Sequence, residues 1–241
     1  MKLLIIRHGD PDYGNDTLTE RGVAEATALN PRMKKINPDF VYVSPLGRAK
    51  KTAELACEGL DVRIETLPWL REFEGRCVKP NLGKEGICWD WMPADWTTRE
   101  IFYDKDRWFT DPAFDGTNVR GEYEKVAAGL DALLARHGYE RNGNFYRAVA
   151  PTNDTVVLFC HFALQCVLIS RLIGCSPMVL WHGTVAAPSS VTTIYTEERR
   201  EGEASFRIGA FGDTSHLWAA GIEPGFSARF CECYMNENER H

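Results

Sequence analysis

The chain has 241 residues, 44% of them hydrophobic and 26% charged, which is the composition of a soluble globular protein. The formal net charge of −6 argues against a general nucleic-acid binder, because affinity for a phosphate backbone comes from many clustered Lys and Arg side chains. No stretch approaches the length of a membrane-spanning helix. A few converging cations can still bind a small anionic substrate.

The beginning of the chain does not read as a secretory signal. Only Lys2 precedes the first apolar run, which is short and meets a charge at Arg7. The eight cysteines include no CxxC pair, and we expect small buried thiols in a reducing cytoplasm. Cys231 and Cys233 could form a metal or redox pair, although two ordinary strand or tail residues are the favoured interpretation. We therefore expect a cytoplasmic protein with no membrane or nucleic-acid partner; the sequence does not indicate its oligomeric state.

The first seventy residues predict repeated strand–turn–helix units. The run 2–6 lacks polar alternation, which is typical of a strand covered on both faces in a parallel sheet. Residues 18–29 predict a helix that Thr19 caps, and residues 39–57 repeat the plan with Ser44 as the helix cap and Pro45 in the first helical position. A third strand is expected within 62–70.

The segment 76–120 breaks this pattern. It is rich in Gly, Pro and charge and holds four of the seven tryptophans. We interpret it as a cap-like insertion with its own small core, within a single domain that spans residues 1–241.

The second half returns to regular elements. Residues 121–138 predict a helix that Gly138 ends. Residues 154–160 predict a buried strand that leads to His161 and an apolar helix, and 189–198 with 204–212 predict an antiparallel pair at one edge. The fold class is therefore α/β, with a mostly parallel central sheet flanked by helices on both faces.

Four cationic or imidazole side chains follow the predicted strands. Arg7 and His8 end one strand, Arg48 lies in the turn after another, and His161 ends a third. The carboxyl ends of parallel strands meet at one sheet edge, where ligands gather. Two arginines and two histidines placed there suit a dianionic phosphoryl group.

Six blocks of the chain resemble the histidine phosphatase superfamily, the phosphoglycerate-mutase-like family. They are RHG at 7–9, LTERG at 18–22, SPLGRAKKTAE at 44–54, LREFEG at 70–75, the apolar strand ending at His161, and GDTSHL at 212–217. A lone RHG recurs by chance, but the ordered set spans most of the chain and leaves only 76–120 unmatched.

The resemblance implies a role for each matched residue. His8 matches the histidine that attacks the phosphoryl group and becomes phosphohistidine. Arg7 and Arg48 match the arginines that hold its oxygens, and His161 matches the second histidine, which donates to the same group. The scheme requires no metal and no cofactor.

Other assignments rest on single positions. Glu72 matches the acid that protonates the leaving oxygen, although Glu74 is an alternative two residues away. Phe162 stands where the family often has Gly and is expected to shape the pocket beside His161. Asn15 is a shifted candidate for the family's phosphate-binding Asn. His216 is expected to order a loop beside the site.

Several functions remain open at this stage. Hydrolysis of a small phosphomonoester is the leading hypothesis, phosphoglycerate mutation the first alternative and a non-catalytic phospholigand-binding domain the second. The segment 10–12, Asp-Pro-Asp, is similar to the opening of magnesium-dependent aspartyl phosphatases, but Arg-His-Gly separates it from the strand. Cys57 and Arg63 fit the C-x₅-R spacing of cysteine phosphatases, yet acidic neighbours would repel phosphate, so this interpretation is rejected.

Overall fold

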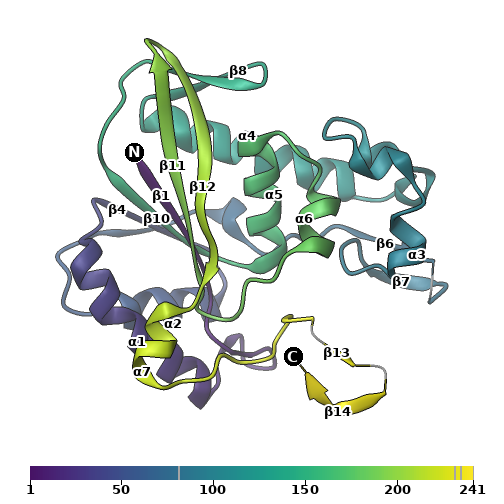
Figure 1. Cartoon of the computed structure of the whole chain (residues 1–241), viewed down its shortest axis with the longest axis horizontal. Coiled ribbons are helices and arrows are strands. Elements are labelled where there is room, and N and C mark those ends of the chain that lie inside the picture. The colour runs from purple at the N-terminus through teal and green to yellow at the C-terminus, as the bar shows by residue number, and fades with distance from the viewer. Residues whose placement is uncertain (81, 231, 234, 241) are drawn as a thin grey trace.

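The computed structural model describes residues 1–80, 82–230, 232–233 and 235–240. Its centre is an eight-stranded sheet in the order β5-β4-β10-β1-β11-β12-β9-β8 (Figure 1). The strands are β1 Lys2–Arg7, β4 Phe40–Val43, β5 Ile64–Thr66, β8 Tyr139–Asn142, β9 Phe145–Ala148, β10 Thr155–Cys160, β11 Val191–Arg200 and β12 Glu203–Asp213. Three short hairpins lie outside it: β2 Pro11–Asp12 with β3 Thr17–Leu18, β6 Arg76–Lys79 with β7 Lys84–Ile87, and β13 Glu232–Cys233 with β14 Asn236–Arg240.

The sheet confirms the α/β class and is more mixed than expected. Strands β5, β4, β10 and β1 run parallel, whereas β11, β12, β9 and β8 join through antiparallel pairs. The β11–β12 pair lies inside the sheet beside β1, so its expected edge position is wrong. The hairpin β8–β9, which turns at Gly143, provides that edge instead.

Helices cover both faces of the sheet, and the side chains of β1 are therefore buried on both faces. Leu3 and Ile5 join the larger apolar cluster with α4 and α5, and Leu4 and Ile6 join a second cluster with α1 and α2. This two-sided burial explains why the run lacks polar alternation. The helices are α1 Glu20–Ile36, α2 Gly47–Ala56, α3 Pro93–Trp96, α4 Val119–Arg136, α5 Phe162–Ile173, α6 Pro177–Gly183 and α7 Ser215–Ala220. In the described residues, none of them is long and apolar enough to cross a membrane.

The N-terminal cap predicted from the sequence is correct for α1 and wrong for α2. Thr19 caps α1 as expected, since its side chain accepts from the N–H of Gly22. The second helix begins at Gly47 after Leu46, so the expected cap at Ser44 and first position at Pro45 are wrong. Ser44 is used elsewhere, in the candidate site.

The segment 76–120 is built of the β6–β7 hairpin, α3 and the 3-10 turns η2 Glu100–Tyr103, η3 Trp108–Thr110 and η4 Pro112–Phe114. Trp91, Phe102 and Trp108 belong to the larger cluster, and Trp108 meets Trp181 of α6 with ring centroids 5.4 Å apart. The expectation of a separate small core is therefore wrong. The segment extends the main core on the α4–α6 side (Figure 1). Similarly, the third predicted strand is shortened to β5, because the 3-10 turn η1 Pro68–Leu70 follows it.

Candidate active site

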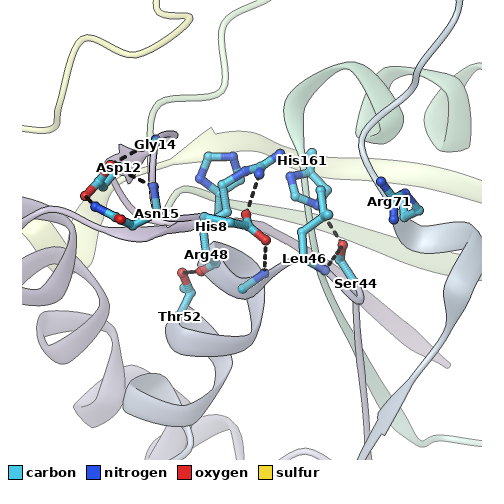
Figure 2. Close-up of polar contacts among 12 residues, drawn as sticks. His8, Asp12, Gly14, Asn15, Ser44, Leu46, Arg48, Thr52, Arg71 and His161 are labelled. Atoms are coloured by element: carbon cyan, nitrogen blue, oxygen red, sulfur yellow. Dashed lines mark hydrogen bonds and ion pairs between the residues drawn. The ribbon is translucent and has the colours of Figure 1, made fainter.

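Three adjacent strands deliver the predicted residues to one edge. In the order β4, β10, β1, their ends are followed by Ser44, His161 and His8. Arg48 lies in the first turn of α2, which follows β4. The His8 and His161 rings have centroids 5.0 Å apart, and Figure 2 shows them beside each other near Arg48. The structure therefore brings together the predicted side chains of Arg7, His8, Arg48 and His161, which the sequence spreads over 155 positions.

His8 is held in one tautomer. Its Nδ1 lies 2.7 Å from the carbonyl oxygen of Gly9, and because a carbonyl only accepts, Nδ1 carries the proton and Nε2 has the lone pair. The side chain is 2% exposed, and burial, followed by the charge of Arg7, lowers the pKa of His8 well below its usual value. A neutral imidazole with a free Nε2 is the form required for nucleophilic attack.

The turn after His8 depends on close backbone packing. The N–H of Gly9 donates to the Thr52 hydroxyl across 3.0 Å. A Cβ at position 9 would lie 2.7 Å from the carbonyl oxygen of Gly22, so only glycine fits there. The RHG block and the helix of the LTERG block are thus packed directly together.

His161 is oriented by Ser44. Its Nε2 lies 2.7 Å from the Ser44 hydroxyl, which also accepts from the N–H of Leu46. If the hydroxyl proton points to Nε2, the proton of the imidazole is on Nδ1. Burial, then the neighbouring His8 and Arg48, lowers the pKa of His161 well below its usual value.

The two arginines are fixed by different partners. Arg7, 1% exposed, donates from Nη1 to the carbonyl of Ala186 at 2.7 Å and from Nη2 to that of Ser227 at 2.6 Å. Arg48 donates from Nη1 to Asp16 at 2.7 Å. Among the described residues, Arg7 Nε, Arg48 Nε and His161 Nδ1 are buried without a hydrogen-bond partner. Unpartnered buried donors are rare, and three in one cluster indicate a site for an anion.

Glu72 adds a carboxyl group on the α5 side of the cluster. Its Oε1 accepts from the N–H groups of Phe73 at 2.9 Å and Leu164 at 3.0 Å. Burial raises the pKa of Glu72 in spite of these hydrogen bonds and of the positive charge of Arg7. Glu74 is instead exposed and pairs with Arg71 at 2.9 Å. The geometry therefore favours Glu72 over Glu74 as a proton donor.

Comparison with known proteins identifies the family. Residues 3–207 match the family described as histidine phosphatase superfamily (branch 1). The chain belongs to the histidine phosphatase superfamily. It is a phosphatase, an enzyme of the phosphoryl-transfer type.

Two of the relatives below match most of the chain, and a third matches a shorter part of it. The chain is 33% identical over 192 residues to "Adenosylcobalamin/alpha-ribazole phosphatase" of Salmonella typhi, which covers 76% of the chain and 84% of that protein. A match to the protein of the same name from Salmonella typhimurium is 35% identical over 82 residues, 30% of the chain and 41% of that protein. A phosphoserine phosphatase from Entamoeba histolytica, solved with 3-phosphoglyceric acid, shares the fold: 23% identity, TM-score 0.58, 90% of the chain and 98% of that chain.

Two predicted binding residues of this histidine phosphatase lie in different surroundings. Asn15 is exposed on the β2–β3 hairpin, and its amide donates to Asp12 at 2.8 Å, turned away from His8 (Figure 2). Phe162 is fully buried at the start of α5, with the guanidinium carbon of Arg7 6.0 Å from its ring centroid. The structure thus places Phe162 against the cluster and leaves Asn15 outside it.

Sequence reasoning missed the C-terminal contribution to the site. Besides Ser227, Ala228 accepts from Arg7 Nη1, at 3.4 Å. Asp10 accepts from the Ser227 hydroxyl at 3.0 Å, and Glu25 accepts from the N–H groups of Asp10 and Gly225, each at 2.7 Å. Asp10 thus anchors the C-terminal segment. The one indication of this contact is Glu25, because a carboxylate on the buried face of α1 needs a hydrogen-bond donor from another part of the chain.

No group of three or more His, Cys, Asp or Glu side chains is placed to hold a metal ion in the part of the chain that the structure describes. Cys231, one half of the pair considered from the sequence, lies outside the described residues.

Proposed function

We propose that this protein hydrolyses a phosphomonoester of a small metabolite through a phosphohistidine on His8. The observation that carries the proposal is the tautomer of His8, whose Nδ1 is bonded to Gly9 beside three unpartnered donors. Mere binding of a phosphoryl group would need the donors but no free imidazole nitrogen beside them.

In the first step, Nε2 of His8 attacks phosphorus and the bond to the alcohol oxygen breaks. The leaving oxygen takes the proton of the Glu72 carboxyl group, whose raised pKa favours the protonated form. Arg7, Arg48 and His161 stabilise the charge on the transferring group. Arg7 can contribute through its unpartnered Nε while its two Nη atoms stay on the carbonyls.

In the second step, water attacks phosphorus and the N–P bond breaks. The Glu72 carboxylate accepts the proton of that water, phosphate leaves and His8 regains its lone pair. A mutase would use the same phosphoenzyme but return the phosphoryl group to a retained sugar acid. The phosphatase names of the relatives support transfer to water.

The test is brief exposure of the protein to labelled phosphomonoester, quenching, and analysis for acid-labile phosphate on His8. We expect the label in wild type and in a His137→Gln control, which changes a buried histidine bonded to Tyr42, and none in His8→Ala. Equal turnover by wild type and His8→Ala would overturn the proposal. Hydrolysis that EDTA abolishes and Mg²⁺ restores would favour the aspartyl alternative, and conversion of phosphoglycerates without release of phosphate would favour the mutase.

We also propose a cytoplasmic location and a single domain with 76–120 as an insertion. The buried free thiols of Cys57, Cys88, Cys160 and Cys166 support the first, and the packing of Trp91 and Trp108 into the larger apolar cluster supports the second.

A further inference from the structure

We propose that an aromatic-walled pocket beside Arg7 binds the alcohol part of the substrate, and that this part carries a flat aromatic or heteroaromatic ring with a hydrogen-bond donor. The inference rests on the proposed function and names the substrate class of the same site. We call this hollow the aromatic pocket; its volume is about 370 Å³ and its walls include Asp90, Trp91, Trp96, Trp181, His182 and Phe230.

The pocket has a preformed stacking wall. The rings of Trp96 on α3 and His182 on α6 are stacked, with centroids 4.9 Å apart and planes 20° from parallel. His182 Nδ1 donates to the carbonyl of Met178 at 2.7 Å, so its Nε2 is the acceptor for the N–H of Trp91 at 2.8 Å. Burial lowers the pKa of His182, which keeps the ring neutral. Because both ring nitrogens of His182 are hydrogen-bonded, its ring forms a wall of the pocket and does not act as an acid or base. The proton donor in the proposed mechanism is Glu72.

Asp90 supplies a polar group on the rim of these rings. It is exposed and has a φ of 77°, a left-handed conformation that is uncommon outside glycine and that recurs at ligand sites. Its Oδ2 accepts from Lys79 at 3.1 Å, and the Lys79 side chain is only 8% exposed. Because the Asp90 side chain is exposed, its Oδ1 can accept a hydrogen bond from a ligand. A substrate that carries a carboxylate besides its phosphate, such as a phosphoglycerate, would meet the negative charge of Asp90.

The pocket adjoins the predicted phosphoryl site through shared segments. Val185 lines it and directly precedes Ala186, whose carbonyl holds Arg7. Asp90 and Phe230 also line a neighbouring hollow together with Ser227 and Ala228, the other two residues that hold Arg7. The two hollows therefore border the backbone that fixes Arg7.

The aromatic pocket is also on the side of the predicted acid. Trp181 packs against Phe73, the residue after Glu72, with centroids 5.4 Å apart, and its Nε1 donates to the carbonyl of Ala163. Phe230 packs against Phe162, the residue after His161, at 5.4 Å. Because the leaving oxygen must lie next to Glu72, the group attached to it extends toward these aromatic walls.

The test compares adenosine 5′-monophosphate with ribose 5-phosphate. Both are phosphate esters of the same primary alcohol of ribose, and only the nucleotide carries an aromatic base. We expect wild type to favour the ring-bearing substrate by about tenfold in kcat/KM, the size of one base-stacking contact. Trp96→Ala should remove that preference by raising KM for the nucleotide, and it should leave kcat/KM for ribose 5-phosphate unchanged. The matched control is Trp218→Ala, at a tryptophan that is 89% exposed on α7, and it should keep the preference.

A second variant guards against misfolding of Trp96→Ala. Val185 is an exposed residue of the pocket wall, and Val185→Phe should raise KM for the nucleotide alone by narrowing the entrance. Equal kcat/KM for both substrates in wild type, or equal effects of Val185→Phe on both, would overturn the inference while leaving His8-dependent turnover intact. Loss of the proposed function itself would appear differently, as turnover that does not depend on His8.

Discussion

Ser189 donates its backbone N–H to the carbonyl oxygen of His8 across 3.0 Å, while its hydroxyl lies 3.1 Å from Nε2 of His216. Ser189 is fully buried with a φ of 59°, a conformation that costs a non-glycine residue free energy. The hydrogen bond to His216 therefore helps to hold Ser189 in place behind His8. This contact places the GDTSHL block next to the RHG block.

This geometry predicts a ranking of two variants at position 189. Ser189→Gly accepts the positive φ at no steric cost, whereas Ser189→Ala keeps the strain and loses the same hydroxyl. We expect Ser189→Gly to have the higher free energy of unfolding, by about 1 kcal/mol, in urea titrations. A more stable Ser189→Ala would mean that glycine relieves no backbone strain at this position.

The buried His216 predicts a loss of stability in acid. Burial, followed by the charge of Arg32, lowers the pKa of His216 from 6.5 to about 4. Between these values the unfolded chain binds a proton that the folded protein does not, so the free energy of unfolding falls as the pH falls from 6.5 toward 4. Wild type should lose about 2 kcal/mol more than His216→Gln between pH 7 and pH 5, measured by denaturant titration at both values. Equal losses would show that folding does not lower the pKa of His216.

The convergence of the predicted catalytic residues could be read from the sequence, and the partners that hold them could not. Arg7, His8 and His161 follow apolar runs, and strand ends in a parallel sheet meet at one edge, so their convergence follows from local pattern. Ser44 was interpreted as a helix cap because Pro45 follows it. Its bond to His161 depends on the adjacency of β4 and β10, which no local pattern encodes.

The same limit applies to the aromatic segment and the C-terminal segment. Trp91 and Trp108 were rightly expected to be buried, but which core they join depends on α4 to α6, which come later in the chain. The contact between Arg7 and Ser227 spans 220 positions and uses a backbone carbonyl, which leaves no signature in side-chain pattern.

Arg48 offers a test of geometry against charge. Nη1 of Arg48 donates to Asp16, and its Nε has no partner and can donate to the phosphoryl group. The planar guanidinium is needed to make both hydrogen bonds at once. We expect Arg48→Lys to lower kcat/KM about 100-fold on ribose 5-phosphate although the charge is kept. The exposed Arg199→Lys is the control and should be neutral. If Arg48→Lys keeps the wild-type kcat/KM, Arg48 contributes only its positive charge and the geometry of its guanidinium group is not required.

Glu72 can be assigned by a variant that separates the two chemical steps. Glu72→Gln removes the proton donor, so kcat on an alkyl phosphate should fall about 10²- to 10⁴-fold. With 4-nitrophenyl phosphate the first step needs little acid, because nitrophenolate is a good leaving group. The second step still needs the carboxylate to accept the proton of water. Rapid mixing of Glu72→Gln with this ester should therefore give a burst of one nitrophenolate per active site, followed by slow turnover.

The matched control for this experiment is Glu74→Gln. Glu74 is exposed and paired with Arg71, so its variant should show wild-type rates on both substrates and no burst. If the burst appears in Glu74→Gln and not in Glu72→Gln, the acid is Glu74. The hydrogen bonds that Glu72 accepts from Phe73 and Leu164 would then be structural, because a carboxylate that accepts two backbone N–H groups can also serve to fix the start of α5.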